Sequence, residues 1–251
     1  DIHEKEQRHT TAQLNASTYG ERIKNEITHG IGITDTLKQV LISENGKFNQ
    51  FDTIAKNLMS DSIESVQLAP DGVVTDIYPI SGNEAGKIDL IHDKNRGKIS
   101  RYARDNHTII TQGPFKLKQS GYGVAVRNPV YLKDENGQEY FWGFTIVILH
   151  VPDIFSDTLN ALSNFGYEYR LSKTDAPWSD TYKVVYQSDR QLTHPVSYKF
   201  TIGEENWRFE VTPKSGWKNN TLIAEVGVVF TAIVILLSVL TRVWLVSKEH
   251  K

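Results

Sequence analysis

The sequence predicts an α+β fold, in which a long N-terminal stalk helix is followed by two antiparallel sheet modules and one C-terminal transmembrane helix. Three observations support this class. Apolar residues recur at helical spacing across residues 4–41, short apolar runs separated by turn signals fill residues 63–211, and residues 226–241 carry no charge. Strands grouped after a leading helix, rather than alternating with helices, are typical of α+β domains.

The first segment, residues 1–46, is predicted to be the stalk helix. Steps of four dominate among its apolar residues, which is the spacing of one helix face; they are Leu14, Tyr19, Ile23, Ile27, Ile31, Leu37 and Leu41. Gly20, Gly30 and Gly32 each weaken a helix by about 1 kcal/mol, and a bend is expected at the last two. A narrow stripe of this kind packs either along its own domain or on a second copy in a homodimer.

The next segment, residues 47–164, is predicted to form the first, membrane-distal module. Pro70-Asp71-Gly72 and the run from Asp134 to Gly137 are strong turn signals. The predicted elements are a helix over 50–60, strands over 63–69 and 73–78, a mostly helical stretch over 83–105, a strand–turn–strand unit over 111–131, a strand over 139–151 and a helix over 152–164. Two hairpins and five strands predict a PAS-like antiparallel sheet.

The second module, residues 165–221, is shorter. Its predicted strands are 167–172, 183–187, 196–202 and 207–211. They predict a smaller, membrane-proximal PAS-like sheet.

Residues 222–246 are predicted to span a membrane. They are apolar except for Glu225 and Arg242 near the ends, and a spanning helix needs about 20 apolar residues. A buried core helix would instead keep a polar face. Arg242 near the end of the segment and the lysines after it place residues 247–251 in the cytoplasm and residues before Leu222 outside it. The polar start of the chain leads us to expect a further membrane helix upstream.

Composition and motifs exclude several classes of function. The net charge is −2 and the pI is near 6.5, so no basic face is expected for nucleic acid. The chain has no cysteine, which removes disulfides and thiolate chemistry. No nucleophile, phosphate-binding or dinucleotide-binding motif is present, and no two of the eight histidines are three or four residues apart. We therefore expect this region to be non-enzymatic, without metal or cofactor.

Three polar residues are candidates for a binding site. Arg127 interrupts an apolar strand, where it either faces inward to hold a carboxylate or phosphate or points to solvent. Asp89 lies among Ile88, Leu90 and Ile91, where it is either a buried ligand contact or an exposed turn cap. Tyr78 ends a strand and either adds a hydroxyl to the same cavity or packs in the core.

Several stretches, taken in order, resemble the CHASE domain. They are Phe51-Asp52 to Leu58-Met59, VQLAPDGVVTDIYP from Val66, Asn83-Glu84-Ala85, Asp89-Leu90, GPFKLKQSGYGVAVRNPVY from Gly113, and Phe141-Trp142-Gly143-Phe144. CHASE domains are extracytoplasmic ligand sensors of bacterial and plant receptors, including the cytokinin receptors. The resemblance covers about residues 51–164 and implies a stalk helix and two PAS-like modules between membrane helices.

The resemblance also implies site residues. It places the family's pocket aspartate on Asp89 and a pocket-lining strand end on Thr111, with Phe115 beside it. The plant receptors have apolar residues where this chain has Arg127 and Asn128. That departure counts against an adenine-type ligand and favours a polar or anionic one.

From these observations we expect the sensor region of a membrane receptor. A small molecule would bind in the first module, and the transmembrane helix would carry the signal to a cytoplasmic histidine kinase or diguanylate cyclase. The alternative is a structural or protein-binding ectodomain whose pocket is filled by its own side chains.

Overall fold

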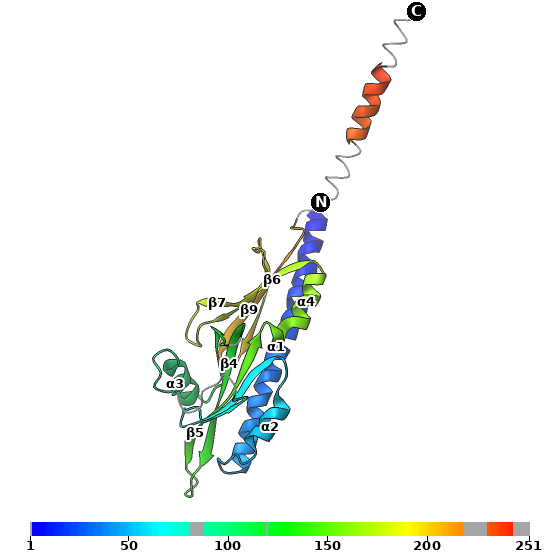
Figure 1. The fold of residues 1–251 in the computed structure, drawn as a ribbon. Helices are drawn as coiled ribbons and strands as arrows, with labels where there is room; N and C mark the ends of the chain where they lie inside the picture. The colour runs from blue at the N-terminus through cyan, green and yellow to red at the C-terminus, as the bar shows by residue number, and fades with distance from the viewer. Residues whose placement is uncertain (1, 81–87, 119, 218–229, 243–251) are drawn as a thin grey trace, which may run out of the picture.

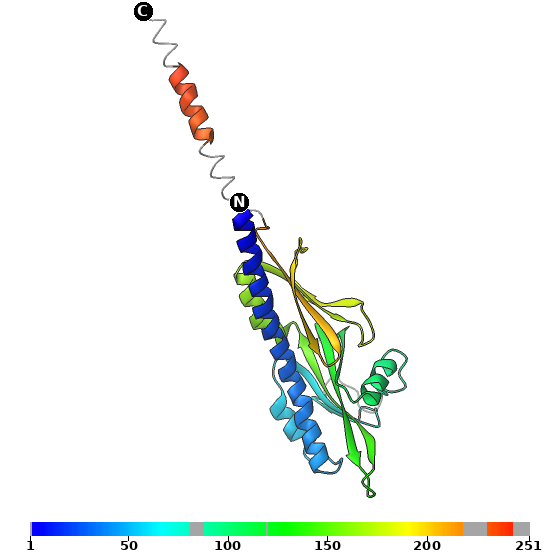
Figure 2. The same cartoon turned by 180° about the vertical axis from the view of Figure 1, so that it is seen from behind.

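The computed structural model describes residues 2–80, 88–118, 120–217 and 230–242. One helix, α1 (Ile2–Ser43), runs beside two antiparallel sheets along their whole length (Figure 1). The view from behind shows both sheets on the same side of this helix (Figure 2). The predicted α+β class, with a long N-terminal helix and two antiparallel sheets, is confirmed.

The apolar stripe of α1 packs within its own chain. Its buried residues include Ala12, Ala16, Tyr19, Ile23, Ile27, Leu37 and Leu41. The helix continues unbroken through its glycines, two of which allow close approach. A Cβ at Gly20 would lie 2.4 Å from the Tyr198 ring, and one at Gly30 would lie 2.6 Å from Leu149. Each of these glycines therefore faces a different sheet.

The first sheet has the strand order β2-β1-β5-β4-β3. Its elements are α2 (Phe51–Leu58), β1 (Ile63–Pro70), β2 (Asp76–Tyr78), β3 (Ile110–Lys116), β4 (Tyr122–Lys133) and β5 (Glu139–Val151). Side chains alternate between the two faces of a strand. One face, which includes Val66, Val126 and Val147, joins the core beside α1. The other face, which includes Ala125, Ile146 and Ile148, belongs to a separate apolar cluster.

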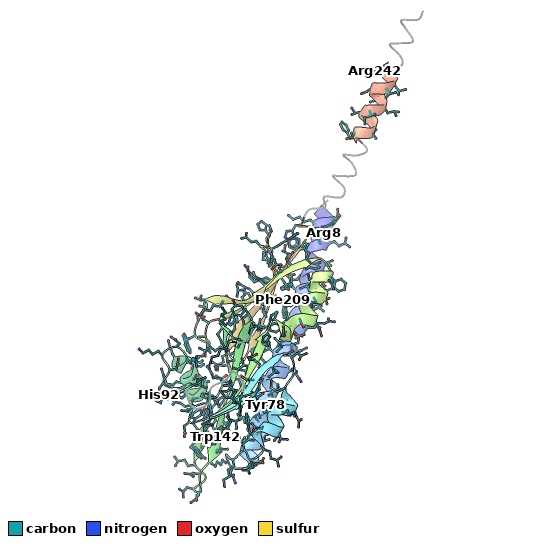
Figure 3. The ribbon with its side chains drawn as sticks, in the orientation of Figure 1. Arg8, Tyr78, His92, Trp142, Phe209 and Arg242 are labelled. Atoms are coloured by element: carbon teal, nitrogen blue, oxygen red, sulfur yellow. The ribbon has the colours of Figure 1, made fainter. Side chains whose placement is uncertain are left out.

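The second sheet has the order β7-β6-β9-β8. It follows η1 (Asp153–Phe155) and α4 (Ser156–Asn164) and consists of β6 (Tyr167–Thr174), β7 (Tyr182–Gln187), β8 (Val196–Ile202) and β9 (Glu205–Pro213). Its core residues Phe200, Trp207 and Phe209 are buried and belong to the same cluster as the α1 stripe. Figure 3 labels Phe209 in this sheet.

Within the part that the structure describes, the expectation of a mostly helical segment over residues 83–105 was right for residues 97–105 and wrong for residues 88–96. The helix there is α3 (Gly97–Asp105), whereas residues 88–96 form turns and one bridge between Val73 and Asp89. Asp89 and Asp93 explain the difference, because each carboxylate accepts hydrogen bonds from backbone N–H groups two and three residues later. Such contacts compete with helix formation.

The predicted membrane segment lies largely outside the described residues. Residues 230–242, its described part, are helical and exposed. Among the helices that the structure describes, none is long and apolar enough to cross a membrane.

Candidate functional site

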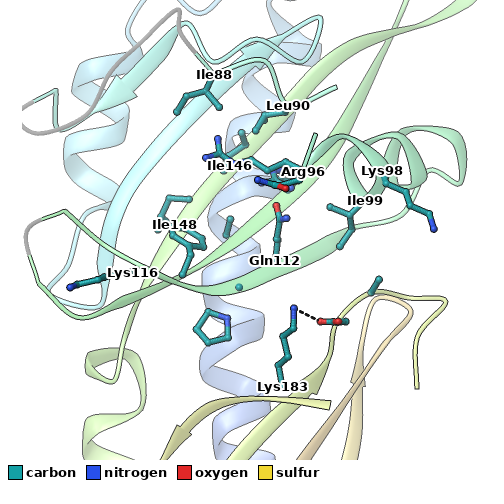
Figure 4. A pocket seen from close by; sticks show the side chains of 18 of the residues that line it. Ile88, Leu90, Arg96, Lys98, Ile99, Gln112, Lys116, Ile146, Ile148 and Lys183 are labelled. Atoms are coloured by element: carbon teal, nitrogen blue, oxygen red, sulfur yellow. Dashed lines mark ion pairs between the residues drawn. The ribbon is translucent and has the colours of Figure 1, made fainter. Parts of the chain in front are cut away.

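A cavity of about 1320 Å³ lies on the face of the first sheet that points away from α1. Three parts of the chain surround it: the sheet itself, the segment leading into α3, and the connection between β6 and β7 (Figure 4). The cavity is therefore lined by both sheet modules.

Strand register explains the floor of this cavity. Gln67 of β1 and Arg127 of β4 both pair with Ile146 of the central strand β5. In the neighbouring row, Ser65 and Ala125 both pair with Ile148. All six side chains line the cavity, because residues two apart on a strand share a face. The floor is thus a mixed surface in which polar groups alternate with isoleucine.

Arg127 is the buried cation of this floor. Its side chain is 4% exposed, so the inward orientation is the one the structure shows. Nη1 donates to the Ser100 hydroxyl at 3.3 Å, whereas Nε has no hydrogen-bond partner among the described residues. Burial, assisted by the nearby charge of Arg96, lowers the pKa of Arg127 to about 9. Arg127 is therefore still a cation at neutral pH.

Cations predominate around the cavity. Among the described residues that line it, seven are cationic, Lys94, Arg96, Lys98, Lys116, Lys118, Arg127 and Lys183, and three are acidic, Glu64, Asp175 and Asp180. Asp175 is already paired with Lys183 at 2.8 Å, the contact drawn in Figure 4. The lining has a positive balance although the whole chain is slightly negative.

The second module supplies a wall that the sequence did not predict. Residues of the β6–β7 connection, including Ala176, Trp178 and Asp180, line the cavity. The Trp178 ring lies 5.2 Å from the Tyr102 ring of α3, and the Lys98 ammonium lies 4.6 Å from the Trp178 ring centre. No motif marks this connection, so its role becomes visible only when the two sheets are placed side by side.

Two of the five predicted site residues line the cavity, namely Arg127 and Phe115. Asp89, Thr111 and Tyr78 are not among the described lining residues. The predicted ligand contact of each of the five stays a prediction.

Asp89 lies beside the cavity and binds the backbone of its own turn. Its neighbours Ile88 and Leu90 line the cavity, whereas Asp89 is not among the described lining residues. The carboxylate accepts the backbone N–H groups of Ile91 and His92, each at 3.0 Å, and lies 2.8 Å from the His92 ring nitrogen. The bonds from His92 lower the pKa of Asp89. These contacts are those of the turn cap, one of the two roles considered for Asp89 from the sequence.

Tyr78 lies on the opposite face of the first sheet. It packs on the core beside α1, while the adjacent Ile77 lines the cavity. Figure 3 shows Tyr78 near α2 and away from the His92 side of the module. The Tyr78 side chain, whose hydroxyl was predicted to line the cavity, therefore lies on the face of the sheet that packs against α1.

Thr111 belongs to a buried joint between the two modules. Its backbone N–H and hydroxyl both donate to Glu205 Oε2, at 2.5 and 2.7 Å. The other oxygen, Oε1, lies 3.0 Å from the Lys173 ammonium, and both charged side chains are fully buried. Burial raises the pKa of Glu205, while Lys173 and Thr111 oppose the rise. This joint connects β3 with β6 and β9.

Replacing Lys173 with methionine should make the stability of the chain fall as pH rises. Without the ammonium, nothing of equal strength offsets the burial of Glu205, so the pKa of its carboxyl moves further above that in the unfolded chain. The folded state then binds more protons, and the free energy of unfolding drops by up to about 1.4 kcal/mol per pH unit above about pH 4.5. Denaturation at pH 5 and pH 8 measures the slope; a slope equal to that of wild type would contradict the prediction.

Comparisons with solved structures define the class of the fold. The ligand-binding domain of the amino acid chemoreceptor PctC from Pseudomonas aeruginosa PAO1, solved with GABA, has a TM-score of 0.55 at 13% identity, covering 82% of this chain and 98% of that one. The periplasmic sensory domain of the Campylobacter jejuni chemoreceptor Tlp1 has a TM-score of 0.51 at 14% identity, covering 83% and 95%. The fold is that of periplasmic sensor domains.

A third structure is an extracellular ligand binding receptor from Desulfohalobium retbaense DSM5692, with a TM-score of 0.59 at 12% identity. The match covers 80% of this chain and 40% of that receptor. The chain thus spans less than half of the receptor's length.

The family follows from the sequence. The CHASE domain matches residues 44–182, more than half of the chain, whereas no curated protein sequence matches. The chain belongs to the CHASE-domain family, as the resemblance predicted. The match extends beyond residue 164 to the end of the β6–β7 connection, which lines the cavity.

Proposed function

We propose that this chain is the extracytoplasmic sensor region of a membrane receptor and that the cavity between its two modules binds a small-molecule ligand. One observation carries the proposal: both modules line the same cavity. A ligand that contacts both walls would favour one arrangement of the modules over another, which is the requirement for a ligand-driven switch. The CHASE family and the periplasmic sensor fold support the same reading.

In this proposal the signal travels along two connections. The buried joint of Thr111, Glu205 and Lys173 links the cavity strand β3 to the second sheet, and α1 packs on both sheets. Residues before Leu222 would lie outside the cytoplasm, and residues 222–246 would anchor the chain. A cytoplasmic histidine kinase or diguanylate cyclase would read the change. Moving such a switch from mostly off to mostly on needs about 5.5 kcal/mol of differential binding.

We also propose that the receptor is a homodimer paired through α1. The inner face of α1 is occupied by its own chain, so pairing would use the outer face. Leu14, which is 65% exposed, and Gly32, which has open space around it, lie on that outer side.

Filling the cavity should abolish ligand binding. Gln112, on β3, lines the cavity with its Oε1 buried and unpaired within the described part of the chain, and Gln112→Phe would place a ring there. The full chain, purified in detergent, is screened against a metabolite library by thermal shift. We expect at least one compound to raise the melting temperature of wild type and not that of Gln112→Phe.

The matched control is Gln138→Phe, in the exposed hairpin turn between β4 and β5 and outside the cavity. This variant should keep the ligand-induced shift. A compound that stabilises wild type and Gln112→Phe equally would place the ligand site elsewhere, and a library without any stabilising compound would favour the structural or protein-binding alternative.

A further inference from the structure

The most unusual group in the cavity is the guanidinium of Arg127. It is buried to more than nine-tenths and lines the cavity. Among the described residues, its hydrogen-bond partner is a neutral hydroxyl, that of Ser100, at 3.3 Å. Within the described part of the chain, no carboxylate lies at ion-pair distance from it. A buried charge is costly unless it is paired and hydrogen-bonded, and among the described residues this cation has no directly paired carboxylate.

The surroundings increase the attraction for an anion. Arg96, on the segment before α3, also lines the cavity and is close enough to disfavour the charge on Arg127. Two cations that repel each other both gain when an anion comes between them. Asp93 and Glu205 partly favour the charge on Arg127, but their hydrogen bonds go elsewhere: Asp93 accepts two backbone N–H groups, and Glu205 is held by Lys173 and Thr111.

Apolar side chains flank Arg127 within this mixed floor. Its two cross-strand neighbours are Ile110 and Ile146, and Ile148 and Ala125 follow in the next row. From the other side, Ile88 and Leu90 close the same space (Figure 4). An inorganic anion would leave this apolar surface uncovered, whereas an organic anion would cover it and gain about 25 cal/mol per Å² of apolar area removed from water.

We infer that the ligand is a small organic anion with an apolar body directly beside its acid group, and that Arg127 binds that acid group through Nε and an Nη nitrogen. The inference rests on the proposed sensory function and adds the chemical class of the ligand. The planar guanidinium fork suits a carboxylate or a phosphate, because either can accept two parallel N–H bonds. The contact would also satisfy the unpaired Nε atom.

The test uses anions with matched neutral partners. The probes are hexanoate against hexanamide, phenylacetate against phenylacetamide, and phenyl phosphate against phenol and inorganic phosphate, each titrated against the full chain in detergent. We expect one or more of the organic anions to bind and its neutral partner not to bind. Arg127→Met should weaken that binding at least about 30-fold, because it removes a charge-assisted bidentate contact.

Two further variants separate charge from geometry. Arg127→Lys keeps the charge but loses the fork, so we expect an intermediate affinity. Lys133→Met removes one positive charge from the exposed end of the same strand and should change the affinity less than about 3-fold, because the exposed charge is screened. If Lys133→Met weakened binding as much as Arg127→Met, net charge rather than Arg127 would determine affinity, and the inference would fail.

The outcomes distinguish the ligand class from the function. Binding of neutral probes that is lost in Gln112→Phe would uphold the sensory cavity and overturn the anionic class. Equal binding of inorganic phosphate and phenyl phosphate would overturn the apolar body. Carboxylate binding without phosphate binding, or the reverse, identifies the acid group.

A ligand-free measurement tests the unpaired cation directly. Because Arg127 has no carboxylate at ion-pair distance among the residues that the structure describes, Arg127→Met should melt at the same or a higher temperature than wild type in a buffer of low anion concentration. Added sulfate should raise the melting temperature of wild type more than that of the variant. A drop of more than about 5 °C in Arg127→Met would correspond to roughly 1–2 kcal/mol and would show that the guanidinium is already stabilised, which overturns the inference even if no probe binds.

Discussion

Replacing Glu205 with alanine is expected to lower the free energy of unfolding by about 3–5 kcal/mol. The change leaves the buried Lys173 ammonium without its carboxylate, which lies at 3.0 Å in the wild-type chain. It also leaves the buried N–H and hydroxyl of Thr111 without their acceptor. Both losses occur out of contact with water, where unpaired polar groups cost most. Chemical denaturation of the full chain measures the shift.

The control is the double variant Lys173→Met with Glu205→Gln. Glutamine keeps a carbonyl oxygen for Thr111, and methionine removes the ammonium, so no charge is left unpaired. A buried ion pair can be replaced by neutral groups at little cost, and we expect the double variant to recover most of the loss. A double variant as unstable as Glu205→Ala would show that side-chain shape, not charge, accounts for the effect.

Gly143→Ala is expected to cost about 3 kcal/mol or more. Gly143 has a φ of +149°, and a Cβ there would lie 2.1 Å from the Ala69 carbonyl oxygen and 2.8 Å from Pro70 Cα. Positive φ costs an L-residue about 1–3 kcal/mol, and the obstructing atoms are backbone, which cannot rotate aside. The pairing of β1 with β5 must open at this point. A lower denaturation midpoint with a reduced far-UV strand signal is the expected observation.

Gly137→Ala separates strain from collision. Gly137 has a φ of +79° with open space around its Cβ position, so alanine there carries only the backbone strain. We expect Gly137→Ala to be milder than Gly143→Ala by about 2 kcal/mol or more. If both variants lost the same free energy of unfolding, the β1–β5 backbone contact would separate without an energetic cost, and the prediction would be wrong.

Much of the fold was predictable because local signals agreed with the tertiary structure. The predicted strand over residues 139–151 coincides with β5, and that over 63–69 lies one residue short of β1. The turn signals at Asp71 and Asp134 lie in the observed turns. The segment around Asp93 failed because its composition suits a helix while its aspartates bind the backbone N–H groups instead.

Less of the site was predictable, since its chemistry depends on long-range neighbours. β4 is buried on both faces, so alternation could not decide which way Arg127 points. Thr111 lies 94 positions before its partner Glu205, and no local pattern links them. The wall at Trp178 follows from the placement of the second sheet, which no short motif encodes.

The two glycines of α1 that receive side chains from different sheets have a consequence for how such receptors diverge. Tyr198 fits against Gly20 and Leu149 against Gly30, so the helix sets the rotational phase of one module relative to the other. One inserted residue between the two glycines would turn the helix by about 100° and move one contact out of register. Recombination that exchanges a cavity module between receptors should therefore succeed only when the length of helix between the two glycine contacts stays the same or changes by whole helical turns.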